Sequence, residues 1–273
     1  MRLPLSLLVL LAALLAPSDA QAAKFVASLT SLRVNAGPGD ISTHAYPLTL
    51  DKGELPTKFK FRLEDWWRSE DGLQSFYAQP GTLTRSCANW VSVNPVEAVV
   101  QPGETLMTRL TISVPTDASA GGYWCVLTVD EVPDPLRAPN GVGAMFVASV
   151  STGVFIYLEP VKRSVEFTDV QVEAMHAVLA MRNDGNAPVG VEGRVEFFRP
   201  VDLAIVAALS IPRVTLLTEP VTRATVRVPL PSPSTLPSGR YLVRAIIDIG
   251  LDHYIGVEQE LQVSRQIAAT TSP

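Results

Sequence analysis

The chain has 273 residues, of which 47% are hydrophobic and 18% charged, with a formal net charge of -5. This length suffices for one large domain or two of medium size, and the low charged fraction excludes a disordered chain. With 22 basic against 27 acidic residues, no release of counterions draws the chain to a polyanion, so we expect no nucleic-acid partner.

The first segment of the chain has the pattern of a secretory signal peptide. Arg2 precedes an apolar run from Leu3 to Ala16, and Ala20-Gln21-Ala22 forms a small-x-small cleavage site. The run of about 14 residues is shorter than the roughly 20 that a spanning helix needs. We therefore predict cleavage after Ala22, a mature chain without a membrane span, and a periplasmic or secreted location.

Short apolar runs separated by Gly, Pro, Asn and Asp clusters follow, and they favour β-strands over helices. The candidate strands of the first half are Phe25 to Val34, Thr43 to Leu50, Lys58 to Trp66, Ala88 to Val93, Leu106 to Val114, Gly122 to Val129 and Met145 to Leu158. Their number and spacing are typical of an immunoglobulin-like sandwich. We assign this domain to residues 23–160.

A second set of strands indicates a second sandwich at 161–265, followed by a flexible tail at 266–273. The strands are Ser164 to Val172, His176 to Arg182, Val191 to Phe198, Ala204 to Ala208, Val214 to Leu217, Thr222 to Val228, Gly239 to Ile249 and Tyr254 to Val263. The boundary falls at Glu159-Pro160-Val161-Lys162, because a proline ends a sheet strand. The predicted fold class is all-β, with two tandem immunoglobulin-like β-sandwich domains.

Both halves contain a turn, a Gly and then a Tyr that opens a long apolar strand. The first copy is Gly121-Gly122-Tyr123 and the second is Gly239-Arg240-Tyr241. In immunoglobulin-like domains a Tyr at this corner donates its hydroxyl back to the upstream backbone. We predict structural roles for Tyr123 and Tyr241.

Cys87 and Cys125 are the two cysteines of the chain. In an oxidising compartment two cysteines commonly pair, so we predict a disulfide. The alternative is that Cys125 is a buried free thiol within an apolar strand.

No catalytic or metal-binding motif is present in the sequence. The chain lacks a Gly-x-Ser-x-Gly elbow, a His-Glu-x-x-His pair, a phosphate loop and a dinucleotide fingerprint. His44, His176 and His253 are isolated from each other and from both cysteines. We predict a protein that is not an enzyme and that has no metal or other cofactor.

Two segments are candidates for binding. Trp66 and Trp67 end a strand before a polar loop, where tryptophans form either a core edge or an exposed stacking surface for sugars or peptides. The segment from Glu131 to Gly141 is a long, proline-rich loop between two strands that should be neighbours.

The order of motifs in the first half resembles a known family. Trp90 to Val96, Gln101 to Thr105, Leu110 to Pro115 and Tyr123 to Leu127 are followed by a long apolar strand that ends at Phe155 to Pro160. This order is similar to the N-terminal domain of PapD-like periplasmic pilus-assembly chaperones, and also to the sandwiches of WxL-interacting surface proteins. In PapD-like domains a loop at the position of Glu131 to Gly141 becomes ordered when a partner binds.

The resemblance implies that the last strand of the first domain is donated to an incomplete partner subunit. Its apolar row contains Phe146, Ala148, Val150, Val154, Ile156 and Leu158. We predict partner contacts at Val150, Val154, Ile156 and Leu158, although the same alternation occurs in any strand with one face on the core.

A pair of basic residues in the family anchors the terminal carboxylate of the partner. Arg33 matches the arginine of that pair in position, and we assign it to the partner-binding site. The lysine of the pair has no counterpart, because Ser151 to Phe155 contains no cation.

We therefore predict an exported, non-enzymatic binding protein that engages an exported polypeptide, such as a pilus or surface subunit, through the last strand of its first domain. The alternative is a cell-surface structural or glycan-binding module whose contact is made by Trp66 and Trp67. The oligomeric state and the identity of the partner stay open.

Overall fold

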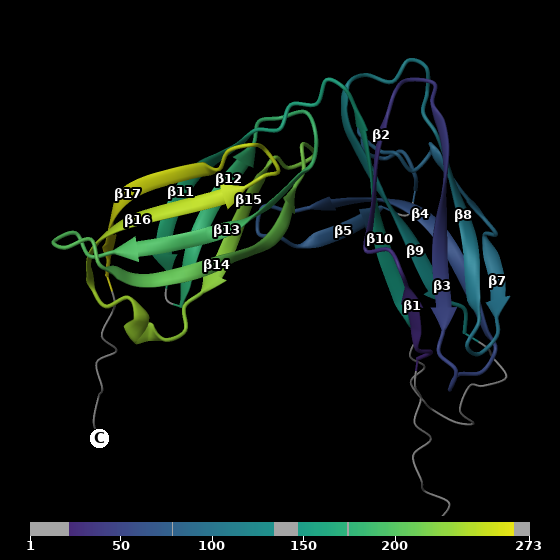
Figure 1. Ribbon diagram of the computed structural model, residues 1–273, viewed down its shortest axis with the longest axis horizontal. Coiled ribbons are helices and arrows are strands. Elements are labelled where there is room, and N and C mark those ends of the chain that lie inside the picture. The colour runs from purple at the N-terminus through teal and green to yellow at the C-terminus, as the bar shows by residue number, and fades with distance from the viewer. Residues whose placement is uncertain (1–21, 78, 134–146, 174, 265–273) are drawn as a thin grey trace, which may run out of the picture.

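The structure is a computed structural model that describes residues 22–77, 79–133, 147–173 and 175–264. The strands form two β-sandwiches (Figure 1), which confirms the predicted all-β fold with two tandem immunoglobulin-like domains. Residues 1–21 of the predicted signal peptide, most of the proline-rich loop, Phe146 and the predicted tail lie outside the described residues. Among the described residues, no helix is long and apolar enough to cross a membrane.

The first sandwich is built from a four-stranded and a six-stranded sheet. Its strands are β1 (Phe25–Ala27), β2 (Ser31–Ala36), β3 (Ile41–Leu50), β4 (Thr57–Arg68), β5 (Gln74–Tyr77), β6 (Val91–Asn94), β7 (Glu97–Val100), β8 (Thr105–Ser113), β9 (Gly121–Glu131) and β10 (Ser149–Leu158). The order β1-β3-β8-β6 forms one sheet, and β2-β10-β9-β4-β5 forms the other, with β7 paired to β4. β10 therefore lies between β9 and β2.

The second sandwich is built from a three-stranded and a four-stranded sheet. Its strands are β11 (Val165–Glu173), β12 (His176–Asn183), β13 (Val189–Phe198), β14 (Ile205–Leu216), β15 (Arg223–Pro229), β16 (Gly239–Asp248) and β17 (Ile255–Val263). The sheet orders are β11-β12-β15 and β14-β13-β16-β17. We propose that the domain boundary lies in the linker between β10 and β11.

Two strand predictions were wrong, each for a physical reason. The segment predicted as one strand from Phe25 to Val34 forms β1 and β2, which belong to different sheets. The segments predicted as two strands at Ala204 to Ala208 and Val214 to Leu217 form the single strand β14. Pro212 does not interrupt β14, because an edge strand tolerates a residue without an N–H donor.

The predicted disulfide between Cys87 and Cys125 is confirmed, and it lies in the core of the first sandwich. Both cysteines are fully buried beside Ile112, Val154 and Ile156. The bond joins the segment before β6 to β9, so it fastens the loop that follows β5 to the middle of the domain.

Both predicted tyrosine corners are confirmed. The hydroxyl of Tyr123 donates to the carbonyl of Ser119 at 3.0 Å, and that of Tyr241 donates to the carbonyl of Pro237 at 2.9 Å. In each case the acceptor lies four residues upstream. The same corner therefore fixes the start of β9 in one sandwich and of β16 in the other.

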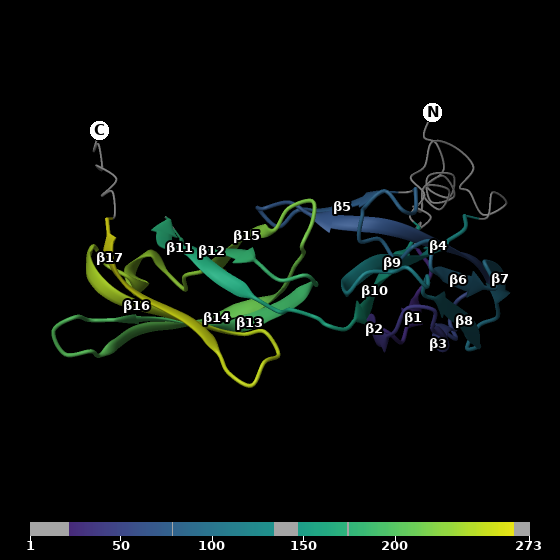
Figure 2. The same ribbon diagram turned by 90° about the horizontal axis from the view of Figure 1, so that it is seen from above.

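The two sandwiches meet over the outer face of β9 and β10 (Figure 2). The buried cluster at this junction consists of Trp66, Trp124, Val126, Phe155 and Tyr157 from the first sandwich and Ala187 and Leu217 from the second. At the tip of the β4–β5 hairpin, the carbonyl of Glu70 accepts a hydrogen bond from the amide of Thr225 in β15. The junction thus combines apolar burial with a backbone contact between the domains.

Close approach of the backbones at this junction explains the pair Gly121-Gly122. A Cβ at Gly121 would lie 2.6 Å from the carbonyl oxygen of Asn186, and one at Gly122 would lie 2.5 Å from Cδ of Pro188. The amide of Gly122 also donates to the carbonyl of Asn186 at 2.9 Å. The turn between β12 and β13 therefore rests directly on the start of β9.

Candidate partner-binding site

β10 is the strand that the sequence predicts to engage a partner, and only part of it is covered by neighbouring strands. β9 pairs with it along its whole length, from Ser149 to Leu158. β2 pairs with it in parallel, but only from Gly153 onward. Within the described ranges, residues Ser149–Thr152 of β10 therefore have a strand on one side and an open edge on the other.

The four predicted contact residues of β10 lie in different surroundings. Val154, Ile156 and Leu158 are at most 1% exposed and pack around the disulfide. In this conformation these three side chains contact the core and not the solvent. Val150 is only partly buried, at the start of the same row and beside the open edge.

A polar network holds the open segment against β9. Arg62 donates through Nε to Asp130 at 2.5 Å and through Nη1 to Glu64 at 2.5 Å. Ser149 donates to the same Asp130, and Thr128 donates to Glu64 at 2.9 Å. Although partial burial raises the pKa of Asp130, hydrogen bonds from Arg62 and Ser149 outweigh it and hold that pKa below its ordinary value. Through Ser149, and through Ser151, whose hydroxyl lies 3.1 Å from that of Thr128, the network links the start of β10 to β9.

Thr152 marks the point where β10 passes from open to covered. Its hydroxyl donates to the carbonyl of Leu29 at 2.8 Å and is 3.0 Å from the hydroxyl of Tyr46. Leu29 lies in the short connection where the chain leaves β1 for β2. Burial raises the pKa of Tyr46, so this hydroxyl stays protonated as a donor. The crossing of the N-terminal segment is thus fastened to β10.

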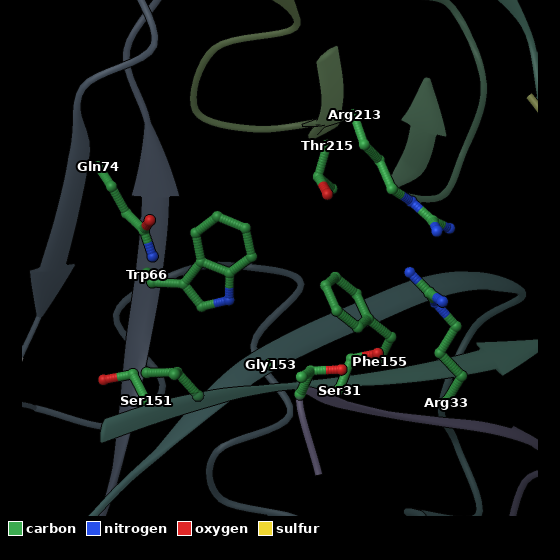
Figure 3. Close-up of a pocket in the computed structure, with 11 residues that line it drawn as sticks. Ser31, Arg33, Trp66, Gln74, Ser151, Gly153, Phe155, Arg213 and Thr215 are labelled. Atoms are coloured by element: carbon green, nitrogen blue, oxygen red, sulfur yellow. The ribbon is translucent and has the colours of Figure 1, made fainter. Parts of the chain in front are cut away.

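A cavity of about 410 Å³ opens between the sandwiches at the end of the open edge (Figure 3). Ser31 and Arg33 of β2 and Ser151, Gly153 and Phe155 of β10 contribute to its walls. The carbon Cζ of Arg33 lies 5.6 Å from the centre of the Phe155 ring, in a cation–π arrangement. The predicted anchor residue is therefore exposed, in β2, beside the point where pairing with β10 begins.

Tyr157 adds to the aromatic floor between the domains. Burial raises the pKa of Tyr157, while the positive charges of Arg33 and Arg163 act to lower it. Cζ of Arg163 lies 5.5 Å from the centre of the Tyr157 ring. Two guanidinium groups thus gather over the outer face of β10, where a negatively charged group would be stabilised.

The structure places Trp66 in the junction between the domains rather than on a free surface. Trp66 is 5% exposed and meets the ring of Phe155 edge-on at 6.3 Å between centres. Its Nε1 is buried and has no hydrogen-bond partner among the residues that the structure describes. Trp67 is half-buried and stacks on Tyr77 at 6.4 Å. Trp66 therefore exposes little of its ring for stacking against a sugar, and that part lines the cavity between the sandwiches.

Two features of this region had no part in the sequence prediction. The turn Asp184 to Pro188 contacts both the linker and the start of β9, and Arg213 of β14 lines the cavity together with Arg33. The Gly121-Gly122 pair is a signal of close backbone approach that could have indicated the contact of this turn with β9. No pattern in the sequence indicates that Arg213 lines the cavity.

Among the described residues, no group of three or more His, Cys, Asp or Glu could hold a metal ion.

Comparison with known proteins gives matches in structure alone. No family model and no curated protein matches the sequence. A solved structure of a chaperone–tip adhesin complex of CFA/I fimbriae biogenesis matches with a TM-score of 0.50 and 11% identity, covering 87% of this chain and 98% of that one.

Other solved structures match at lower TM-scores. The Escherichia coli chaperone DraB matches at 0.46 and 13% identity, covering 89% of this chain and 99% of that one. A complex of the Salmonella enterica SafA pilin with the SafB chaperone matches at 0.48 and 11%, covering 88% and 98%. With the two sandwiches and the first match, the chain has the two-domain fold of the PapD-like pilus chaperones.

Proposed function

We propose that this protein is an exported, non-enzymatic assembly factor that binds a partner polypeptide by strand addition at the open edge of β10. The observation that carries the proposal is the partial pairing of β10, whose residues Ser149–Thr152 have β9 on one side only within the described ranges. The PapD-like chaperone fold supports the same role.

Strand addition suits this edge for an energetic reason. An unpaired strand edge presents N–H and C=O groups that another extended chain can satisfy. Val150 lies at this edge and is partly exposed, so it can contact an apolar side chain of the added strand. Val154, Ile156 and Leu158 would instead stabilise β10 from the core side, because they are buried there.

The position of Arg33 also gives the added strand a direction. The cavity lies at the Gly153 end of the open segment, where β2 begins its pairing. A partner whose carboxyl end enters the cavity must therefore run parallel to β10, in line with β2. Its terminal carboxylate would then meet the guanidinium of Arg33.

The experiment is affinity capture from an envelope extract of the host, with three forms of the protein as bait. The variant Val150→Asp places a charge at the open edge. The control Val99→Asp places the same charge on β7, at the opposite edge of the same sheet, where the side chain is 57% exposed. We avoid substitutions at Val154 and Ile156, because both side chains are fully buried and the fold would be lost.

We expect the parent protein and Val99→Asp to recover one small exported polypeptide, and Val150→Asp to lose it. The purified pair should then form a complex that shows the same pattern. Equal recovery by all three baits, or recovery of wall glycan alone, would contradict strand addition at β10.

A further inference from the structure

The proposed carboxylate site contains one cation in the first sandwich, and β10 supplies no second one. No basic residue occurs from Ser151 to Phe155. Phe155 is the residue of β10 that pairs with Arg33 in the parallel register, and its ring lies beneath the guanidinium. Any further cation at this cavity therefore comes from another part of the molecule.

Arg213 of the second sandwich reaches the same cavity. Figure 3 shows the guanidinium groups of Arg33 and Arg213 facing each other, one from each sandwich. Both residues also line an adjoining cavity of about 300 Å³. The side chains of Arg33 and Arg213 are both exposed, so an anion that enters the cavity can approach both.

An irregularity in β14 directs Arg213 to this place. Between β13 and β14 the pairing passes from Val191↔Val214 to Gly193↔Ile211, so β14 has one residue more than its partner there. Such a bulge bends the strand and changes the direction of a side chain. Arg213 is in this bulge, directly after Pro212, which has no N–H for a regular ladder.

Gly190 leaves room for the guanidinium of Arg213. A Cβ added at Gly190 would lie 3.7 Å from both Nε and Nη2 of Arg213. This is an ordinary van der Waals distance, so the guanidinium of Arg213 lies directly over Gly190. The bulge therefore brings Arg213 back across β13 toward the cavity.

The charge around the two guanidinium groups is positive on balance. Arg163 is the third cation of the adjoining cavity, and Glu192 and Asp248 are its acidic groups. Among the ion pairs formed by described residues, none includes Arg33, Arg163 or Arg213. Two guanidinium groups that face each other, with no ion-pair partner among the described residues, can both donate to one anion.

We infer that Arg213 is the second cation of the carboxylate site, so that the terminal carboxylate of the partner is held between Arg33 of one sandwich and Arg213 of the other. This inference rests on the proposed function. Its consequence is specificity: a partner is recognised by its free carboxyl end only while the two sandwiches keep their relative position. The hydroxyls of Ser31 and Thr215, which line the same cavity, can donate to the remaining oxygen positions.

The test measures the binding of two fluorescent peptides of alternating valine and threonine, one with a free terminal carboxylate and one with a terminal amide. Fluorescence anisotropy gives the dissociation constants for the parent protein, Arg33→Gln, Arg213→Gln and the double variant. Arg240→Gln is the matched control, because it removes the same charge from an exposed site on β16 that pairs with Glu260. Thermal unfolding checks that each variant is folded.

We expect the parent protein and Arg240→Gln to bind the acid about tenfold more tightly than the amide, as charge-assisted hydrogen bonds predict. Arg213→Gln should lose most of this preference, and Arg213→Lys should recover part of it. Because both arginines would contact one carboxylate, the double variant should lose less than the product of the two single losses.

The alternative outcomes separate the inference from the proposed function. If Arg33→Gln loses the preference and Arg213→Gln keeps it, the inference is wrong and strand addition stands. Equal binding of acid and amide by the parent protein overturns carboxylate recognition and leaves strand addition. Absence of binding to either peptide contradicts the proposed function as well.

Discussion

The central strands β9 and β16 begin with the same tyrosine corner but differ in what covers them. In β9 every residue from Gly121 to Val129 is buried, whereas in β16 buried and accessible residues alternate. The outer face of β9 carries Trp124 and Val126, which pack in the junction between the domains. The outer face of β16 carries Arg240 and Arg244, which pair with glutamates of β17.

This difference shows that the residue pattern of a strand indicates whether its outer face is covered or exposed to solvent. An antiparallel strand with one solvated face alternates apolar and polar residues, and one with two covered faces is apolar throughout. The run Tyr123-Trp124-Cys125-Val126-Leu127 therefore indicates that another layer covers this sheet. In this molecule that layer is the second sandwich.

Removal of the disulfide, which only the first sandwich contains, should give the largest change in the free energy of unfolding. A bond between residues 38 positions apart should contribute about 4 kcal/mol to the free energy of unfolding, by restriction of the unfolded chain. The double variant Cys87→Ser/Cys125→Ser should therefore unfold the first sandwich at much lower urea concentration.

The measurement can follow the two sandwiches separately. All four tryptophans, Trp66, Trp67, Trp90 and Trp124, belong to the first sandwich. Tryptophan fluorescence should report the early transition, while circular dichroism should retain a later one from the second sandwich. A single shared transition in both signals would show that the two sandwiches unfold together, and it would contradict the prediction that they unfold independently.

Substitution of the glycines at the two tyrosine corners should give a smaller change in the free energy of unfolding, and the change should differ between the two corners. Gly121 has a φ of +125° and stands against the carbonyl of Asn186, whereas a Cβ at Gly239 would meet nothing nearer than 3.8 Å. Gly121→Ala should lower the free energy of unfolding by about 2 kcal/mol, because it adds backbone strain and a clash. Gly239→Ala is the control and should change it by less than about 0.5 kcal/mol. Similar losses in urea titrations of both variants would refute the role assigned to the junction.

The smallest effect concerns ion pairs on the two outer faces. The side chains of Arg62 and Asp130 are 38% and 23% exposed, whereas those of Arg240 and Glu260 are 68% and 64% exposed. Screening by water weakens both pairs, and the second more. Asp130→Asn should lower the free energy of unfolding at neutral pH by about 1 kcal/mol, and Glu260→Gln by less than about 0.5 kcal/mol.

The pH dependence gives this prediction a second readout. The pKa of Asp130 is lower in the folded protein, so its stabilising contribution is present above the pKa of the unfolded chain and is lost as the pH falls through the folded value. The difference between the parent protein and Asp130→Asn should therefore begin to shrink as the pH falls below about 4, the ordinary pKa of an aspartate, and should vanish once the pH is below the lowered pKa of the folded protein. A difference that persists in acid would assign the effect to packing instead of charge.

Much of the fold follows from local patterns in the sequence. The alternation of apolar residues indicates most strands, the Gly-x-Tyr spacing indicates both corners, and the two cysteines indicate their bond. These signals are local because strands and corners are formed by residues that are close in sequence. The strands β5 and β7 were missed, since each has only four residues and depends on pairing with β4.

The candidate site could be predicted only in part. Arg33 was indicated by its match to a family position, and β10 by its length and apolar row. Arg213 was not indicated, because the role that we infer for it depends on a bulge in β14 and on the contact between two domains. The sequence also did not distinguish buried from accessible residues along β10, since the coverage by β2 ends within the strand.

The crossing of the N-terminal segment from β1 to β2 has a consequence for the order of folding. β2 pairs with β10, and this pairing joins residues more than a hundred positions apart, such as Ser31 and Gly153. A chain that is synthesised from its N-terminus must hold these first residues unpaired until β10 has been made. Closure of the first sandwich is therefore a late and slow step, as contacts between distant residues require. Until that step, the side of β10 that β2 later covers is accessible along its full length.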